Sequence, residues 1–574
     1  MTDNPSDPQV VLRPPGEVMR LDRLGSSFPT RLSFMRSLVR ALAAEKATVQ
    51  RRVWELDEHG FGRAVYSVEF AGFTYSLVAF STPLADDQRT DRVIADAWDS
   101  SYVLFDGVPT AADLDRLQTS VPRQEAARFE ATDLILSRAN RSVRLFDHAV
   151  EELSHGRQPD DQMVRSVGYL MRTTAVYGNG KFGIADRDGY STRQEMDHPF
   201  RAELLAVWLI RNFTIELVEH IALRRAPAMA VGLEPRLKRF LGVGNATGLG
   251  MAPFLISHPI LINNWFQAKE MALAKVRAVE QAEPITRDRF LHLVGRVAVH
   301  LDQWQVEDEL QMDRIKILRS EWAELATTID DRWLAAPQPW DRLLAHCERW
   351  SLEGQELMVA AVLEPNGELV DGLSCCMSNP LDPSINPTET VGELKAAIDR
   401  DWAWALAVDF EDRSESAQFW YVSQDNLEPR IGLRYEEPGA ELEQPLDIAR
   451  RVQRLAASLR AYMASVGSGA LEATVADFLF ANPDDRYAVG RVQTLSRHPF
   501  AEIRGNMIAE SCRPIDLLRA KLAFFGASRF DPKSDRWTRV SLYQGAPLAE
   551  DIASGCDPDD WWLASLGPEP GLSV

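Results

Sequence analysis

Residues 241–259 read LGVGNATGLGMAPFLISHP, with four glycines inside nine residues. Glycine is needed where φ is positive or where the backbone comes close to another group. Backbone N–H groups in a loop that leads into a helix also make a binding site for anions. An apolar segment with helical spacing follows at 250–282. The stretch therefore predicts a loop that holds an anion at a helix N-terminus.

The candidate anion-binding residues of this stretch are Gly244, Asn245, Thr247, Gly248 and Gly250. The stretch does not match the nucleotide motifs. A Walker loop requires Lys and Ser/Thr after its last glycine, and the dinucleotide pattern requires glycine at position 247. The alternative is a helix–loop–helix turn without a ligand, where glycine allows C-capping and close packing.

A second glycine cluster, RTTAVYGNGKFGIADRD, lies at 172–188. Lysine beside glycines can reach a phosphate or carboxylate, and it acts as a base when burial lowers its pKa. We therefore predict Lys181 and Tyr177 as catalytic residues and Asn179 and Arg187 as substrate-binding residues. The alternative is a hairpin turn that carries an exposed lysine.

Three histidines precede proline: His198, His258 and His498. A histidine at a helix N-terminus has a lowered pKa and stays neutral, as a general base requires. These three are our remaining catalytic candidates, and Arg504 is a substrate-binding candidate after His498. A lone histidine is more often a capping or core residue. Arginines at 20, 23, 31, 36 and 40 either pair with acidic neighbours or reach a substrate anion.

Metal and thiol signals are weak. Glu152 and His155 have the ExxH spacing, but a di-metal bundle needs two such motifs and further carboxylates, so no metal is predicted. The five cysteines include an adjacent pair, Cys375 and Cys376, and no CxxC occurs. This usage favours a reducing compartment.

Composition limits the class of protein. The chain has 574 residues and a formal net charge of −21, which disfavours nucleic-acid binding. No signal peptide and no run of 18 apolar residues is present, so we expect a cytoplasmic protein without a membrane partner. The length suggests two to four domains. We predict three: 1–110, 111–350 and 351–574.

The predicted fold class is α+β, with a predominantly helical middle region flanked by antiparallel sheet regions. Strand-like alternation marks a meander at 48–81 and a fourth strand at 100–107. Later strands are expected at 356–364, 367–377, 402–410, 417–425, 430–437 and 487–494. Helices are expected at 123–156, 160–173, 199–224, 250–282, 286–334 (with a break near Asp302 or Asp308), 444–465, 470–480 and 512–525.

We expect an enzyme that acts on a small organic anion, a carboxylate or a phosphate, by general acid/base chemistry such as addition–elimination, hydrolysis or isomerisation. One alternative is a redox enzyme that holds a flavin or nucleotide in a non-standard glycine-rich loop. The other is a non-catalytic binding or assembly protein. No particular cofactor is predicted, and association of the chain into a homo-oligomer stays open.

Overall fold

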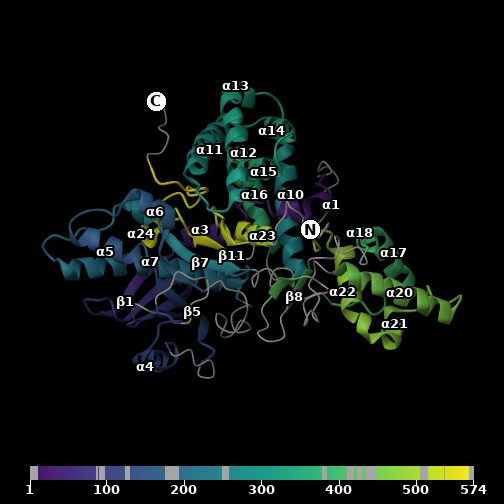
Figure 1. Cartoon of the computed structure of the whole chain (residues 1–574), viewed down its shortest axis with the longest axis horizontal. Coiled ribbons are helices and arrows are strands. Elements are labelled where there is room, and N and C mark those ends of the chain that lie inside the picture. Colours follow the sequence, from purple (N-terminus) through teal and green to yellow (C-terminus); the bar gives the residue numbers. More distant parts are fainter. Residues whose placement is uncertain are drawn as a thin grey trace. The chain divides into compact units, whose positions relative to one another are not determined.

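The computed structural model (Figure 1) describes residues 11–85, 88, 97–122, 129–174, 193–248, 258–377, 384–409, 419–422, 429–432, 448–503, 515–534 and 537–567. The chain forms two compact units, each assembled from separate stretches. The smaller unit comprises Met1–Ser26, Leu249–Ala274 and Pro380–Lys521. The larger unit comprises Ser27–Gly248, Lys275–Asn379 and Leu522–Val574. Among the described helices, none has the length and apolar character that crossing a bilayer requires.

The larger unit contains a sheet whose strands follow the order β1-β2-β3-β4-β5-β6-β7-β11-β10. Every neighbouring pair is antiparallel except β6 and β7, which are parallel. The strands are β1 (Thr48–Leu56), β2 (Gly62–Phe70), β3 (Phe73–Ser81), β4 (Ser100–Asp106), β5 (Asp133–Arg141), β6 (Tyr169–Thr173), β7 (Gly242–Gly248), β10 (Asp531–Ser534) and β11 (Trp537–Leu542).

Alternation along the strands supplies both faces of this sheet with apolar side chains. Val65 and Val78 belong to a buried cluster with Leu114 and Leu117 of α4 (Ala111–Ser120). The next residue along β2, Tyr66, points the other way, and its ring meets the Phe213 ring at 6.3 Å between centroids. Phe213 lies on α7 (Arg201–Arg225), which is buried along most of its length. Helices therefore cover the sheet on both faces.

Helical segments complete the larger unit. Four of them, α11, α12, α14 and α15, pack against one another. Figure 1 shows them as a separate group beside the sheet of the same unit. The helices are α3 (Phe34–Ala44), α5 (Phe146–Ser154), α6 (Asp161–Val167), α8 (Pro235–Phe240), α11 (Pro284–Gln303), α12 (Glu309–Thr328), α13 (Asp331–Leu334), α14 (Pro339–Cys347), α15 (Leu352–Leu363), α16 (Gly367–Val370) and α24 (Ala549–Ala553), with 3₁₀ turns η3 (Gln194–Met196) and η5 (Asp371–Met377).

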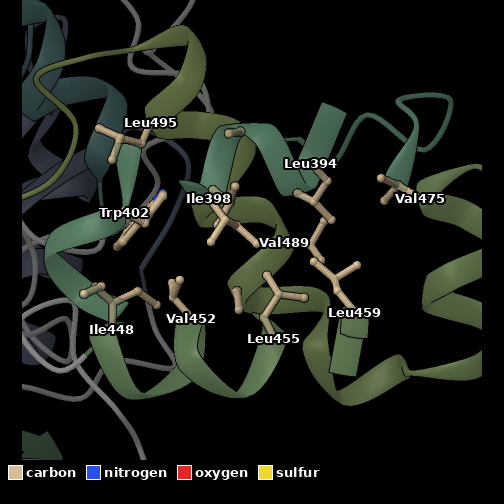
Figure 2. Packing of buried hydrophobic residues seen from close by; sticks show 14 of the residues in the cluster. Leu394, Ile398, Trp402, Ile448, Val452, Leu455, Leu459, Val475, Val489 and Leu495 are labelled. Atoms are coloured by element: carbon tan, nitrogen blue, oxygen red, sulfur yellow. The ribbon is translucent and has the colours of Figure 1, made fainter. Parts of the chain in front are cut away.

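The smaller unit has a helical core (Figure 2). Leu394, Ile398 and Trp402 face Val452 and Leu455 there, and all are buried. Capping boxes begin two of its helices, at Thr390 and Thr474. Its elements are α1 (Pro15–Val18), α2 (Leu21–Leu24), most of α10 (Pro259–Arg277), α17 (Val391–Asp401), α18 (Ala403–Leu406), the hairpin β8 (Phe419–Val422) and β9 (Pro429–Gly432), α20 (Ile448–Val466), α21 (Val475–Ala481), η7 (Pro483–Asp485), α22 (Arg486–Arg497) and most of α23 (Asp516–Phe525).

The predicted α+β class is confirmed, as are the meander, its fourth strand and the long helix at 199–224. The break in 286–334 is also confirmed, because α11 ends at Gln303 and Asp308 caps α12. The strands expected at 417–425 and 430–437 exist as the shorter β8 and β9.

Four predicted strands are wrong. Residues 356–364 lie in α15, 367–377 in α16 and η5, 402–410 include α18, and 487–494 lie in α22. The error at α15 has a physical reason, because its apolar residues are buried on every side of the helix. A helix of this kind lacks the amphipathic period, and a short apolar run does not distinguish it from a buried strand.

Two predicted helices also contain strands. The helix expected at 123–156 includes β5, and the one expected at 160–173 ends at Val167, before β6. Gly168 adopts a left-handed conformation, φ +79°, and so ends α6 and turns the chain into β6. The glycine-rich stretch is a third correction, since Gly242–Gly248 form strand β7 and not a loop.

Candidate functional site

The larger unit contains a cavity with two adjoining chambers. The linker chamber has a volume of about 340 Å³ and takes its name from the 304–308 linker between α11 and α12. The sheet chamber has a volume of about 50 Å³ and lies against β6 and β11. Both chambers are lined by Arg144, Arg165, Ser166, Gln305, Arg529 and Asp531. Only the linker chamber adds Gln162, Asp302, Gln303, Val306, Glu307 and Lys533. Only the sheet chamber adds Val167, Gly168, Tyr169, Trp304, Arg539, Val540, Ser541 and Gln544.

Local structure explains why these side chains converge. Gly168 ends α6 beside the cavity, and a Cβ there would lie 2.8 Å from Ser541 Oγ on β11. Only a glycine allows this close approach and the positive φ together. The turn from α6 to β6 therefore brings Arg165 and Tyr169 to the wall that β11 also forms.

The sheet chamber carries an excess of positive charge. Four arginines line it, at positions 144, 165, 529 and 539, and Asp531 is the one carboxylate among its described lining residues. Ser541 and Gln544 add a hydroxyl and an amide to the lining, while the Ser166 hydroxyl donates to the Met163 carbonyl oxygen at 2.9 Å. Such a wall attracts an anion and offers it several hydrogen-bond donors.

Arg529 is the least satisfied of these arginines. Its Nη1 donates to the Arg165 carbonyl oxygen at 3.4 Å, and its guanidinium lies 5.4 Å from the centroid of the Phe240 ring. Its Nε and Nη2 are buried and have no hydrogen-bond partner. Burial, together with the charge of Arg165, lowers the pKa of Arg529 to about 10, so it remains a cation at neutral pH.

Most buried polar groups in proteins are hydrogen-bonded, and an exception requires an explanation. Within the described part of the chain, no ion pair joins Arg529 to a carboxylate. A buried cation without a counter-ion costs free energy that an anionic ligand would offset. The buried Nε and Nη2 of Arg529 are therefore donors without an acceptor.

Asp531 and Lys533 form the charged edge of the cavity on β10. Lys533 Nζ lies 2.7 Å from Asp531 Oδ2 and 3.1 Å from Glu307 Oε1. The other oxygen of Asp531, Oδ1, is buried without a partner. Burial raises the pKa of Asp531, and its contact with Lys533 opposes the shift only in part. A carboxyl group of this kind is suited to giving or taking a proton.

His300 of α11 stands near Arg529 and is fully buried. Burial, together with the charge of Arg529, lowers the pKa of His300 to about 3. Its Nδ1 donates to the Ala564 carbonyl oxygen at 3.0 Å. His300 is therefore neutral at physiological pH and adds no charge beside the cavity.

The glycines of β7 lie behind one wall of this cavity. Gly244 pairs with Ser541 across the strands, and a Cβ on Gly244 would lie 2.6 Å from the Tyr169 ring. Both neighbours line the sheet chamber. Asn245 is buried, and its Nδ2 donates to the Thr173 carbonyl oxygen at 2.9 Å. Gly244 and Asn245 thus hold strands together at the wall of the cavity.

Thr247 and Gly248 belong to the end of β7, where they pair with Thr538 and Trp537 of β11. The predicted residues Tyr177, Asn179, Lys181, Arg187, Gly250 and Arg504 lie outside the described residues. Their predicted roles stay predictions.

His198 also belongs to the larger unit, just before α7. Burial, followed by the charge of Arg201, lowers the pKa of His198 to about 4, and its Nδ1 is buried without a partner. Burial, not the helix N-terminus, is the largest cause of this shift, and the predicted catalytic role of His198 stays a prediction. His198 is not among the residues that line the cavity.

The other two histidines lie in the smaller unit, close to the same helix. His258 immediately precedes α10, and His498 Nδ1 lies 3.5 Å from Nδ2 of Asn263 on that helix. Asn263 Oδ1 accepts from the Phe500 backbone N–H at 3.1 Å. The structure thus brings two His-Pro segments to one end of α10.

Sequence patterns did not single out the residues that line the cavity. The sole local signal is the recurrence of charge along RFDPKSDRWTR, residues 529–539. A solvent-exposed hairpin has the same charge pattern, so the sequence does not distinguish it from a hairpin that lines a cavity.

The basic N-terminal segment pairs with acidic residues, as one of its two interpretations predicts. In the larger unit, Arg36 contacts Glu364 at 2.7 Å, and Arg31 contacts Asp371 at 2.5 Å. Asp559 contacts Arg31, Arg36 and Arg40. Burial alone would raise the pKa of Asp559, but Arg36, Arg40 and Arg31 together hold it well below its usual value. This network is largely buried, not a solvated helix face.

Metal ligands and thiols do not add a second centre among the described residues. No cluster of three or more His, Cys, Asp or Glu side chains there is arranged to hold a metal ion. Cys375 and Cys376 are exposed on η5 and not packed in a sheet. Burial, followed by the neighbouring Cys375, raises the pKa of the Cys376 thiol, which disfavours the reactive thiolate.

Comparisons with known proteins found no matching family model, curated protein or solved structure. The geometry of the cavity alone therefore indicates a functional site.

Proposed function

We propose that the chain binds a small organic anion, a phosphate or a carboxylate, in the two-chambered cavity of the larger unit. The buried and unpartnered Nε and Nη2 of Arg529 carry this proposal. Arg144, Arg165 and Arg539 add charge around the same space, and Ser541 adds a hydroxyl donor. An anion in the sheet chamber would supply the acceptor that Arg529 lacks.

In this proposal the chain is an enzyme, and Asp531 transfers the proton. Its raised pKa and its unpartnered Oδ1 support the role of general acid or base. Lys533 holds the other oxygen and fixes the orientation of the carboxyl group. Lys181, which sequence patterns favour, lies outside the described residues and stays a separate prediction.

Binding is tested by thermal unfolding of the full chain with inorganic phosphate and with succinate. A ligand at 100 times its dissociation constant stabilises the folded state by roughly 2.7 kcal/mol. We expect wild type to be stabilised by at least one anion and Arg529→Met not to be stabilised. Lys316→Met removes an exposed cation on α12 and should respond as wild type does. Retention of the full shift in Arg529→Met would refute the proposal.

Chemistry is tested separately with Asp531→Asn. Once an anion binds, its conversion is followed by nuclear magnetic resonance in the presence of wild type and variant. The proposal expects the variant to bind the anion and to lose most of the turnover, by about 10²-fold or more, as when a general acid is removed. Equal turnover in both proteins would remove Asp531 from the reaction, and anion binding would stand.

A further inference from the structure

The two chambers differ in chemistry, and the difference describes the ligand. The sheet chamber is small, cationic and rich in donors. Roughly 10–15 Å³ is the least space that holds one water molecule, so its volume of about 50 Å³ suits a group of a few heavy atoms. A tetrahedral phosphate has that size. Four arginines and one carboxylate side chain line the chamber. A phosphate, with about two negative charges at neutral pH, balances this excess of positive charge better than a ligand with one carboxylate group does.

The linker chamber is larger and polar. Six residues of the described part of the chain line this chamber and not the other. Gln162 lies on α6, and Asp302 and Gln303 lie on α11. Glu307 pairs with Lys533, and Val306 is aliphatic. Gln162 and Asp302 offer an amide and a carboxylate for hydrogen bonds with a ligand. The Gln303 amide is bonded to the Leu566 backbone, donating to its carbonyl oxygen at 2.7 Å and accepting from its N–H at 2.9 Å. Asp302 and Glu307 would repel a second anionic group. None of the described residues lining this chamber is aromatic, so they offer no ring for stacking on a nucleobase.

We infer that the ligand is a phosphorylated sugar or polyol, with its phosphate in the sheet chamber and its hydroxylated body in the linker chamber. The inference rests on the proposed anion site and adds the class of ligand. Hydroxyl groups are the neutral partners that satisfy carboxylate and amide acceptors without charge repulsion. A volume of about 340 Å³ lies at the lower end of the range for small-molecule sites, in agreement with a body of sugar size.

The test measures dissociation constants of the full chain by calorimetry for glucose 6-phosphate, ribose 5-phosphate, glycerol 3-phosphate, inorganic phosphate, succinate and glucose. At least one phosphorylated sugar or polyol should bind about tenfold or more tightly than inorganic phosphate, and glucose should not bind. Arg529→Met should abolish binding of every phosphate.

Variants of the linker chamber separate the two ends of the ligand. Gln162→Ala and Asp302→Ala should each weaken binding of the sugar phosphate by about fivefold, the value of one hydrogen bond, while inorganic phosphate binds as before. Glu58→Ala changes an exposed residue in the β1–β2 turn and should bind both probes normally.

The other outcomes overturn the inference in distinguishable ways. If inorganic phosphate binds as tightly as all three esters, the ligand has no body in the linker chamber, and the anion site stands. If succinate binds and phosphates do not, the head is a carboxylate, and the anion site again stands. If no anion binds, both the inference and the proposed function fail.

Discussion

Two buried arginines of the larger unit illustrate how the partner of a charge decides its role. Arg211 donates to the carbonyl oxygens of Leu241, Ala546, Lys238 and Arg239, at 2.6 to 3.0 Å. Arg529 has one long hydrogen bond, to the Arg165 carbonyl. Burial lowers the pKa of both, to about 9 and about 10. The guanidinium of Arg211 is held by backbone carbonyl groups. Arg529 keeps two nitrogens that can donate to a ligand.

Arg211→Met should therefore destabilise the protein strongly, because it leaves the carbonyl oxygens of Lys238, Arg239, Leu241 and Ala546 without their donor. We expect a loss of roughly 3–5 kcal/mol, because each buried acceptor left unsatisfied costs about 1–3 kcal/mol. Arg529→Met removes an unpaired buried charge and should leave the free protein equally stable or more stable. The urea midpoints of the two variants measure this contrast. A large loss in Arg529→Met would mean that its role is structural.

His300 makes the free energy of unfolding of the protein depend on pH. Its pKa is about 3 in the folded protein and roughly 6.5 in an unfolded chain. Because the unfolded state binds the proton more readily, this histidine lowers the stability as pH falls from about 6.5 toward 3. His300→Asn keeps a donor for the Ala564 carbonyl and has no titrating ring.

The slope of unfolding free energy against pH should accordingly be shallower for His300→Asn than for wild type between pH 6 and pH 4, measured by urea unfolding. Carboxylates contribute equally to both proteins, so the difference reports His300. Identical slopes would show that the ring is not buried as a neutral group.

At the scale of elements, the sequence predicted elements with local boundary signals well and short apolar runs poorly. Gly60 and Gly72, both with positive φ, stand between the strands of the meander β1–β3, and Asp308 caps α12. By contrast, α15 is apolar on all sides, and its sequence fits a buried strand equally well.

The residues of the candidate site could likewise be predicted only in part from the sequence. Two glycines of 241–259, Gly242 and Gly244, lie behind one wall of the cavity, where they permit close contact between β7, the Tyr169 ring and β11. The arginines of the sheet chamber come from other segments, at 144, 165, 529 and 539. No pattern within one segment reports that residues about 400 positions apart meet, because the sheet pairing that joins them is not local.

Gly244→Val tests this reading of β7. A Cβ at Gly244 would lie 2.6 Å from the Tyr169 ring, so the ring must move toward the sheet chamber. We expect a loss of about 1–3 kcal/mol in stability, as for overpacked cores, together with weaker anion binding. Gly372→Ala is the matched control, since a Cβ there meets nothing within 4 Å. Unchanged stability of Gly244→Val in urea unfolding would contradict the packing role.

At the scale of the whole molecule, the larger unit is held together by contacts between distant segments. Asp559 joins Arg31, Arg36 and Arg40 near the C-terminus, and Trp562 Nε1 donates to the Pro29 carbonyl at 2.8 Å. Trp561 and Trp562 are both buried, so the C-terminal tryptophans dock on the body of this unit.

Asp559→Ala should destabilise the larger unit by roughly 3–5 kcal/mol, because three largely buried arginines lose a shared counter-ion. Hydrogen exchange followed by mass spectrometry can show which segments lose stability. We expect faster exchange in α3 and in the segment around 543–566, with capped helices of the smaller unit as internal controls. Exchange identical to that of wild type in α3 would exclude a stabilising role for the network.

The position of β11 between β7 and β10 has a consequence for synthesis of the chain. β7 is complete at Gly248, but its antiparallel partner ends at Leu542, about 290 residues later. At ribosomal speeds of about 5–20 residues per second, the Gly242–Gly248 edge waits roughly 15–60 s for that partner. A nascent chain in this interval presents an open strand to other chains, so an early stop before β11 should yield aggregates, and chaperone supply should govern the yield of the full protein.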